Sequence, residues 1–292
     1  MEFRGTYTAM VTPFKDGRVD FDAFKKLLLR QQTARVSGVI PCGCTGEAAT
    51  LSIDERKELI RISLETVGGD IRVVPGTGTN STETTIALTK DAERAGVHAA
   101  MLITPYYNKP SQRGLIDHYL RVADATALPL VLYNVPGRTG VTLAADTVAE
   151  LYATGRYSAI KEAGGSVDAV SDLRSKSGIT VLSGDDSLTV PMMAVGAAGV
   201  VSVVSNLYPG LVREMVERAL DGDFTRAREI HFRMLPIVRA AFVESNPSPI
   251  KAMLALEGLI SNELRAPLAP VSDANLAVIR RALGSFREKG SV

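Results

Sequence analysis

Cysteine and histidine are scarce in this chain of 292 residues, which contains two of the former and three of the latter. Cys42 and Cys44 stand in a Cys-Gly-Cys sequence that is too tight for an ordinary structural disulfide, and His98, His118 and His231 are scattered. No zinc framework is visible in this pattern. Chemistry that needs a metal cluster or a Ser-His-Asp arrangement is therefore disfavoured.

The chain also lacks an excess of charge of one sign and a long hydrophobic run. Its 33 Lys and Arg stand against 32 Asp and Glu, so nothing indicates nucleic acid or an anionic membrane as a partner. No apolar stretch approaches the roughly 18 residues of a membrane span, and the N-terminal sequence lacks the apolar region of a signal peptide. With 46% hydrophobic residues, we expect an ordinary globular protein with a large core, located in the cytoplasm.

Short apolar, β-branched runs alternate with helical patterns along most of the chain. Eight such runs, about 20 to 33 residues apart, predict an α/β fold with a parallel sheet, and eight is the number that closes a (β/α)₈ TIM barrel. Two domains of average size would also fit the length. The expected strands are Tyr7–Val11, Gly38–Cys42, Ile71–Pro75, Ala99–Ile103, Leu130–Tyr133, Ser158–Lys161, Ile179–Leu182 and Val200–Val204.

After the eighth run the pattern is helical. The first expected helix completes the barrel, and the others form a C-terminal helical extension. No linker of low complexity separates the two parts, so we predict a barrel over residues 1–222 and an extension over 223–292 that packs on it. The expected helices are Pro209–Asp221, Thr225–Phe242, Ser248–Ile260 and Asp273–Leu283.

Lys161 ends the sixth expected strand, just before Glu162-Ala163-Gly164-Gly165. In such barrels the chemistry lies at the C-terminal ends of the strands. Burial there lowers the pKa of a lysine to roughly 7–8 and makes its amine a nucleophile toward carbonyl carbon. The simpler interpretation is a solvated lysine like most of the others.

The remaining strand ends carry hydroxyls, tyrosines and one arginine, which suit a small carboxylate that bears a carbonyl. The Gly43–Glu47 turn can hold a carboxylate through its N–H groups and hydroxyls, and Arg138 can bind a second one with its planar fork. Each has a structural alternative: a generic turn, packing of Tyr106 and Tyr107, or an arginine that ties down a loop. A phosphate-binding barrel is disfavoured because the acids of Gly184-Asp185-Asp186 would repel phosphate.

Several motifs in order along almost the whole chain resemble the pyruvate-dependent class I aldolase family, typified by dihydrodipicolinate synthase and N-acetylneuraminate lyase. The resemblance implies a TIM barrel and a Schiff-base mechanism. The motifs are Thr12-Pro13-Phe14, Gly43-Cys44-Thr45-Gly46-Glu47, Gly76-Thr77-Gly78, Thr104-Pro105-Tyr106-Tyr107, Tyr133-Asn134-Val135-Pro136, Ile160-Lys161-Glu162 and Asn246-Pro247-Ser248-Pro249-Ile250-Lys251.

The resemblance also implies roles for individual residues. Lys161 would form the imine with pyruvate, Tyr133 would donate and accept protons, and Thr45 would bind the pyruvate carboxylate. Val201 would face the bound pyruvate with its backbone. Tyr107 would be a relay tyrosine that reaches in from a neighbouring subunit, which implies a homotetramer built as a dimer of dimers. No cofactor is implied, because the lysine imine itself activates pyruvate.

The acceptor is implied by Pro136-Gly137-Arg138-Thr139-Gly140. Family members with this motif use the arginine to hold the carboxylate of L-aspartate 4-semialdehyde, in the lysine and diaminopimelate pathway. Gly184 is a further expected substrate-binding position. The alternatives are the same imine chemistry on a 2-keto-3-deoxy sugar acid, sialic acid or 4-hydroxy-2-oxoglutarate, and a catalytically inactive ligand sensor.

Two features depart from the family pattern. Cys44 stands where a Thr or Ser hydroxyl usually joins Tyr133 and Tyr107 in the relay, and a thiol is a weaker hydrogen-bond donor. The site at which lysine inhibits some family members is also incomplete. Asn80 and Tyr106 match it, but Arg56 and Thr84 replace the usual His and Glu, so we expect weak feedback inhibition or none.

Overall fold

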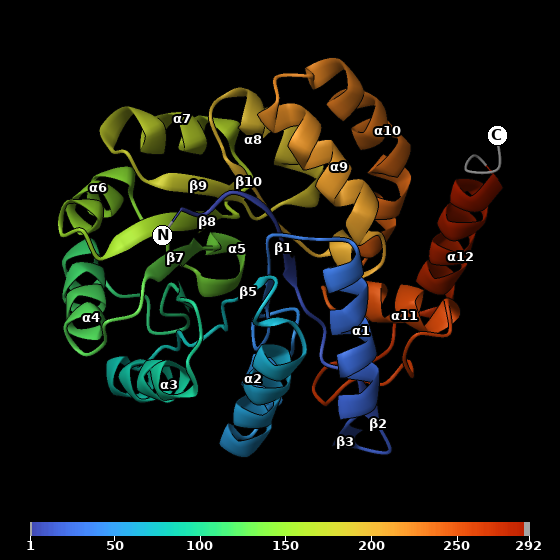
Figure 1. The fold of residues 1–292 in the computed structure, drawn as a ribbon, viewed down its shortest axis with the longest axis horizontal. Coiled ribbons are helices and arrows are strands. Elements are labelled where there is room, and N and C mark those ends of the chain that lie inside the picture. Colours follow the sequence, from blue (N-terminus) through green and yellow to red (C-terminus); the bar gives the residue numbers. More distant parts are fainter. Residues whose placement is uncertain (1, 289–292) are drawn as a thin grey trace.

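A computed structural model describes residues 2–288, and its centre is a sheet of eight parallel strands. The spatial order is β5-β4-β1-β10-β9-β8-β7-β6, and a parallel bridge between Gly76 and Met101 joins the two ends into a barrel (Figure 1). All eight predicted strands are present, with ends displaced by a few residues. Their bounds are Gly5–Ala9 (β1), Gly38–Ile40 (β4), Arg72–Val73 (β5), Ala100–Ile103 (β6), Leu130–Asn134 (β7), Tyr157–Glu162 (β8), Thr180–Ser183 (β9) and Gly199–Ser202 (β10).

Helices surround the strands, and their ends carry the expected capping residues. Ser52 and Glu55 form a reciprocal capping box at the start of α2, and Ser81 caps α3, which ends at a left-handed Gly96. The predicted (β/α)₈ barrel is thereby confirmed. The surrounding helices are Phe21–Thr33 (α1), Ile53–Val67 (α2), Thr82–Ala95 (α3), Gln112–Asp124 (α4), Ala145–Ala153 (α6), Val167–Lys176 (α7), Thr189–Ala194 (α8) and Pro209–Leu220 (α9).

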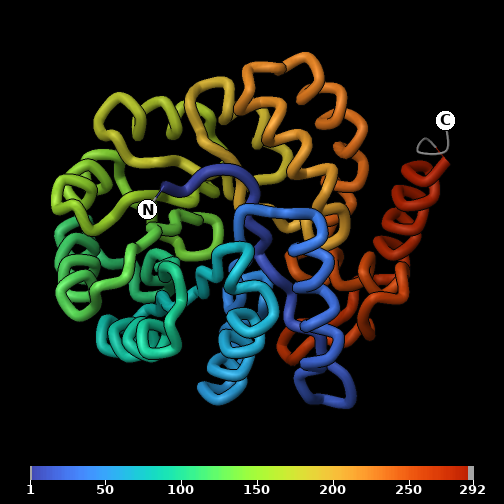
Figure 2. Tube along the Cα trace, viewed as in Figure 1, coloured from blue at the N-terminus to red at the C-terminus, as the bar shows by residue number. Residues whose placement is uncertain are grey.

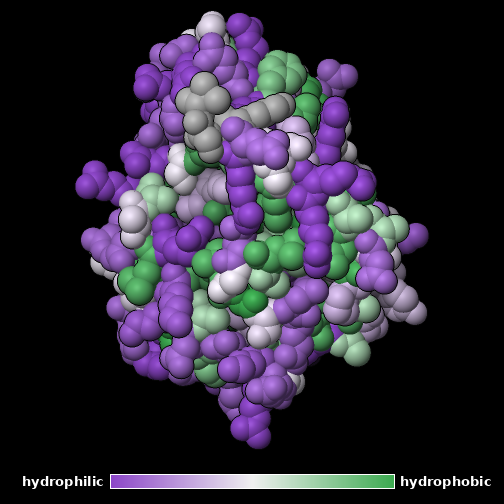
Figure 3. All heavy atoms as spheres, turned by 90° about the vertical axis from the view of Figure 1, so that its right-hand side faces the viewer, coloured by the Kyte–Doolittle hydropathy of each residue, from purple (hydrophilic) through white to green (hydrophobic). Residues whose placement is uncertain are grey.

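The C-terminal extension consists of α10 (Phe224–Ala241), α11 (Ser248–Leu256) and α12 (Asp273–Glu288). It packs on the barrel helices, and its buried side chains belong to the same apolar cluster as theirs. In Figure 2 the red C-terminal chain returns to lie beside the blue N-terminal segment, where Gly17 N–H donates to Glu263 at 2.6 Å. Figure 3 shows that the outer face of this side is largely hydrophilic, with apolar side chains near its middle. A division between residues 222 and 223 stays a prediction.

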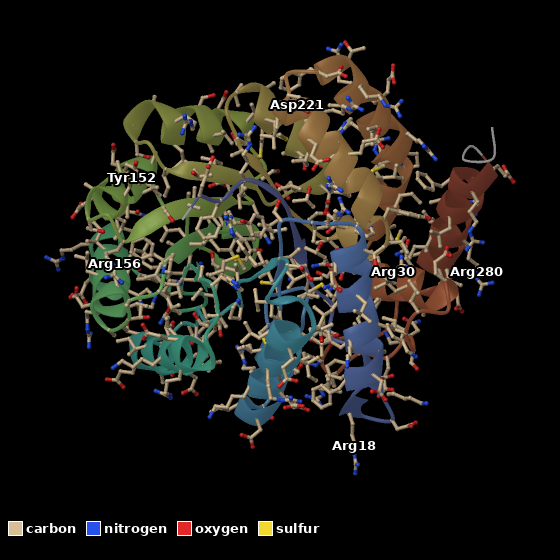
Figure 4. All side chains as sticks on the ribbon, viewed as in Figure 1. Arg18, Arg30, Tyr152, Arg156, Asp221 and Arg280 are labelled. Atoms are coloured by element: carbon tan, nitrogen blue, oxygen red, sulfur yellow. The ribbon has the colours of Figure 1, made fainter. Side chains whose placement is uncertain are left out.

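The structure also contains short elements that the sequence patterns did not predict, among them three 3₁₀ helices at Ala48–Thr50, Asp186–Leu188 and Val204–Asn206. A hairpin of β2 (Phe14–Lys15) and β3 (Arg18–Val19) turns at Asp16-Gly17, both with positive φ, a pair typical of tight hairpins. Arg18 extends away from the molecule at the end of this hairpin (Figure 4). A further element is the one-turn helix α5 (Pro136–Thr139) after β7. Among residues 2–288, no helix is long and apolar enough to cross a membrane.

Candidate active site

Lys161 points into the barrel from β8. Ala159 and Ala163, two residues away on either side, belong to the apolar cluster inside the barrel, and side chains of a strand alternate between its two faces. In register, Lys161 stands between Tyr133 of β7 and Leu182 of β9. Only 5% of Lys161 is exposed, so the sheet delivers a buried amine among apolar neighbours.

Burial lowers the pKa of Lys161 to about 8, while Cys44, Asp186 and Asp185 act in the opposite direction. A pKa of about 8 leaves about one amine in ten uncharged at pH 7, because one pH unit changes the ratio of the two forms tenfold. The Nζ atom lies 4.2 Å from the centre of the Tyr133 ring. A buried amine with this pKa can act as a nucleophile toward carbonyl carbon.

Tyr133 is held protonated beside this amine. Burial raises the pKa of its phenol well above the usual value, and the neighbouring Cys44 raises it further. Thr104 holds the backbone of Tyr133 in place, since the N–H and the hydroxyl of Thr104 both donate to the Tyr133 carbonyl at 2.9 Å. A neutral phenol at this place can donate a proton to a reacting oxygen and take one back.

Thr45 lies in a tight turn after β4. Gly46 N–H donates to the Gly43 carbonyl and Glu47 N–H to the Cys44 carbonyl, each at 3.1 Å. The Thr45 hydroxyl is buried and accepts a hydrogen bond from Asn246 Nδ2 at 2.9 Å. Its hydrogen remains available for a carboxylate oxygen.

Arg138 projects from α5 at the rim of the site. Its Nη2 donates to the Asn246 carbonyl at 2.9 Å, and the side chain is otherwise exposed. Asn246 Oδ1 is buried and has no hydrogen-bond partner among residues 2–288. The rim therefore offers one cationic fork to a ligand.

A cavity of about 350 Å³ lies at the C-terminal ends of the strands. Lys161 and Thr45 do not line it but contact residues that do: the Lys161 Nζ atom lies 4.2 Å from the centre of the Tyr133 ring, and the Thr45 hydroxyl accepts from Asn246. Its lining includes Cys44, Tyr133 and Arg138. Further residues of the lining are Gly43, Tyr106, Thr139, Ser245, Asn246 and Pro247. A proton donor and a cationic fork thus line one small cavity, and an amine and a hydroxyl lie against its lining residues, an arrangement suited to imine chemistry on a keto acid.

The chain matches the Dihydrodipicolinate synthetase family over residues 2–285. The 4-hydroxy-tetrahydrodipicolinate synthase of Methanothrix thermoacetophila is 49% identical over 285 residues, which cover 96% of each chain. The chain belongs to the dihydrodipicolinate synthetase family. The resemblance inferred from the sequence motifs is confirmed.

Solved structures of dihydrodipicolinate synthetase family members agree. The 4-hydroxy-tetrahydrodipicolinate synthase of Methylacidiphilum fumariolicum SolV is 46% identical with a TM-score of 0.97, covering 99% of this chain and 97% of that one. The dihydrodipicolinate synthase of Thermotoga maritima is 42% identical with a TM-score of 0.96, covering 98% and 99%. These relatives confirm the predicted fold and the predicted activity class, a class I aldolase-type synthase of this family.

Besides Lys161 and Thr45, three residues to which the family resemblance gave roles do not line the cavity. Tyr107 is 89% exposed, with a φ of 75°, so its side chain is not covered by the rest of the chain. Val201 is fully buried inside the barrel. Gly184 donates its N–H to the Glu162 carbonyl at 2.7 Å, and an added Cβ would lie 2.5 Å from the Cβ of Ala163. The contacts of Gly184 are those of a packing position.

Several polar residues around the site were not assigned roles from the sequence. Asp186 is buried after β9 and accepts hydrogen bonds from Ser202 Oγ and from Val203 N–H, the latter at 2.9 Å. It faces Lys161, and burial raises its own pKa. Asn246 and Lys251 belong to a motif of the family but carried no assigned chemistry. Within the described residues, no cluster of three or more His, Cys, Asp or Glu could hold a metal ion.

The positions at which lysine binds in some dihydrodipicolinate synthetase family members differ here in their chemistry. Arg56 lines the cavity and donates from Nη2 to the Ala48 carbonyl at 2.5 Å. Asn80 accepts a hydrogen bond from Asn108, and Thr84 is exposed on α3. The predicted loss of lysine inhibition stays a prediction.

Proposed function

We propose that Lys161 forms an imine with pyruvate and that the resulting enamine attacks L-aspartate 4-semialdehyde to give 4-hydroxy-tetrahydrodipicolinate. The observation that carries this proposal is the buried Lys161 amine, whose pKa is lowered to about 8, 4.2 Å from the ring of a protonated Tyr133. A charged lysine would be no nucleophile, and an imine without a proton donor would form slowly.

In the first half of the reaction, the uncharged Nζ attacks the keto carbon of pyruvate. Tyr133 protonates the carbinolamine oxygen, which leaves as water. The Thr45 hydroxyl holds the pyruvate carboxylate, as its buried place in the turn supports. Loss of a proton from the pyruvate methyl group then gives the enamine, with Lys161 still bound.

In the second half, the enamine carbon bonds to the aldehyde carbon of the semialdehyde, and the aldehyde oxygen takes a proton. Arg138 at the cavity rim binds the carboxylate of this acceptor, with the geometry that a planar fork favours. The acceptor amino group then attacks the imine carbon, closes the ring and releases Lys161. No cofactor takes part in these steps.

We also propose that the active form is a homotetramer and that Tyr107 acts in the site of a neighbouring subunit. Its exposure of 89% supports this assignment, because a relay tyrosine that pointed into its own site would be covered by its own chain. Cys44, which lines the cavity and contacts Tyr133, takes the place of the hydroxyl between the two tyrosines. A cytoplasmic location remains the expectation from the sequence.

Two measurements on the wild-type protein test this function. Borohydride reduction in the presence of pyruvate should attach a reduced pyruvate to Lys161, and the adduct should be absent in Lys161→Ala. Turnover of pyruvate with aspartate semialdehyde should be observed with a coupled reductase and loss of NADPH. An adduct without such turnover, but with turnover of a sugar-acid aldehyde, would overturn the proposed acceptor.

A further inference from the structure

Segment 246–251, at the start of α11, makes hydrogen bonds to the turn that carries Thr45. Asn246 Nδ2 donates to the Thr45 hydroxyl, 201 residues away in sequence, at 2.9 Å. Five residues later, Lys251 Nζ donates to Glu47 Oε1 at 2.6 Å. One short segment of the C-terminal extension therefore contacts both the middle and the end of the Gly43–Glu47 turn.

Lys251 is the more unusual of these two residues because it is completely buried. Its ammonium group donates to Glu47 and, at 2.9 Å, to the Thr12 carbonyl after β1, and it lies 4.4 Å from the centre of the Phe14 ring. The Thr12 hydroxyl donates in turn to the Gly46 carbonyl at 2.7 Å. The ammonium group thus joins α11, the segment after β1 and the turn after β4.

Glu47 occupies a backbone conformation that disfavours any side chain. Its φ is 54° and its ψ is 38°, in the left-handed region where a residue other than glycine costs of order 1 kcal/mol or more. Its second carboxylate oxygen, Oε2, accepts from the backbone N–H of Arg265 at 3.1 Å. A strained position that nevertheless carries a fully buried, paired carboxylate indicates a requirement for that carboxylate.

We propose that the Lys251–Glu47 pair is a positioning device for the active site, which fixes the Thr45 hydroxyl at the place where it binds the pyruvate carboxylate. The inference rests on the proposed function, since it uses the role of Thr45 given there. Because Lys251 belongs to α11, the C-terminal extension would then contribute to the affinity for pyruvate. Glu47 lines the cavity, but its carboxylate is bound to Lys251 and to the Arg265 N–H, and Lys251 does not line the cavity.

The alternative is that the Lys251–Glu47 pair only stabilises the fold. The free energy of a buried ion pair distinguishes this alternative from the positioning role. A buried ion pair gains little net stability, because the cost of removing both charges from water offsets their attraction. Removing one partner leaves a buried, unpaired charge, which destabilises strongly, whereas removing both charges together is often tolerated. A variant that lacks both charges therefore keeps the fold while it loses the tether.

The experiment compares the wild-type protein with the double variant Glu47→Gln/Lys251→Met. We expect the double variant to unfold at a temperature close to that of the wild type and to keep its oligomeric state. Its KM for pyruvate should rise about 10- to 100-fold, the effect expected when a binding group moves by about 1 Å. Its KM for the aldehyde and the borohydride adduct at saturating pyruvate should change little.

A matched control removes another lysine–carboxylate ion pair, one that lies on the surface. Lys176 and Asp146 form such a pair at 2.6 Å on the surface, and Lys176→Met/Asp146→Asn should leave the KM for pyruvate unchanged. A folded Glu47→Gln/Lys251→Met variant with wild-type KM for pyruvate would overturn the positioning role alone. Absence of any pyruvate adduct in the wild type would instead overturn the proposed function.

Discussion

Replacing Lys161 with methionine should stabilise the protein near neutral pH while abolishing activity. Burial lowers the pKa of Lys161 from its usual value of 10.5 to about 8. At 1.36 kcal/mol for each pKa unit, holding this amine charged inside the barrel costs about 3 kcal/mol of folding free energy. Methionine fills a similar unbranched volume without a charge.

The sign of the pH dependence follows from proton binding. Below pH 8 the amine is charged in both the folded and the unfolded chain, so the whole cost is present. Between pH 8 and 10.5 the folded state has released the proton and the unfolded state still binds it, so the wild type gains stability as the pH rises. The advantage of Lys161→Met should therefore be about 3 kcal/mol at pH 7 and should disappear as the pH approaches 10.5.

Denaturant unfolding of both proteins across this pH range measures the difference directly. For a chain of this size the advantage at pH 7 corresponds to an increase of about 6 °C in Tm. Lys25→Met on the exposed face of α1 is the control, and its effect should show no such pH dependence. Equal stability of Lys161→Met and the wild type at pH 7 would refute the idea that burial disfavours the charged amine.

Four further outcomes are expected. Arg138→Ala should raise the KM for aspartate semialdehyde about 10- to 100-fold, because a charge-assisted bond is lost, with the KM for pyruvate nearly unchanged in the coupled assay. Cys44→Ala should lower kcat about 100-fold, whereas Cys44→Ser should keep or raise kcat. A wild-type kcat in Cys44→Ala would exclude a proton relay through this position. Glu47→Gln alone should lower the free energy of unfolding by about 3–5 kcal/mol, since it leaves Lys251 buried and unpaired; an unchanged denaturant midpoint would contradict this. Free lysine should not inhibit in the submillimolar range in the same coupled assay, and inhibition there would show that Arg56 and Thr84 do not weaken effector binding.

Local sequence patterns were sufficient to predict the barrel and the position of Lys161 in it. The strands are short, mostly apolar runs, several helices begin at a capping residue such as Ser52 or Ser81, and both signals act over a few residues. The same periodicity places Lys161 at a strand end, where this fold has its chemistry. The hairpin turn at Asp16-Gly17 also had a local signal, which was overlooked.

Only the tertiary structure decided how these residues meet. The neighbouring position of Lys161 and Tyr133 depends on the register between two strands, and the lowered pKa of the amine depends on what surrounds it. The contact between Glu47 and Lys251 joins residues 204 positions apart. No local pattern encodes such a contact, because hydrogen bonding and burial depend on distance in space, which only the closed barrel and its packed extension establish.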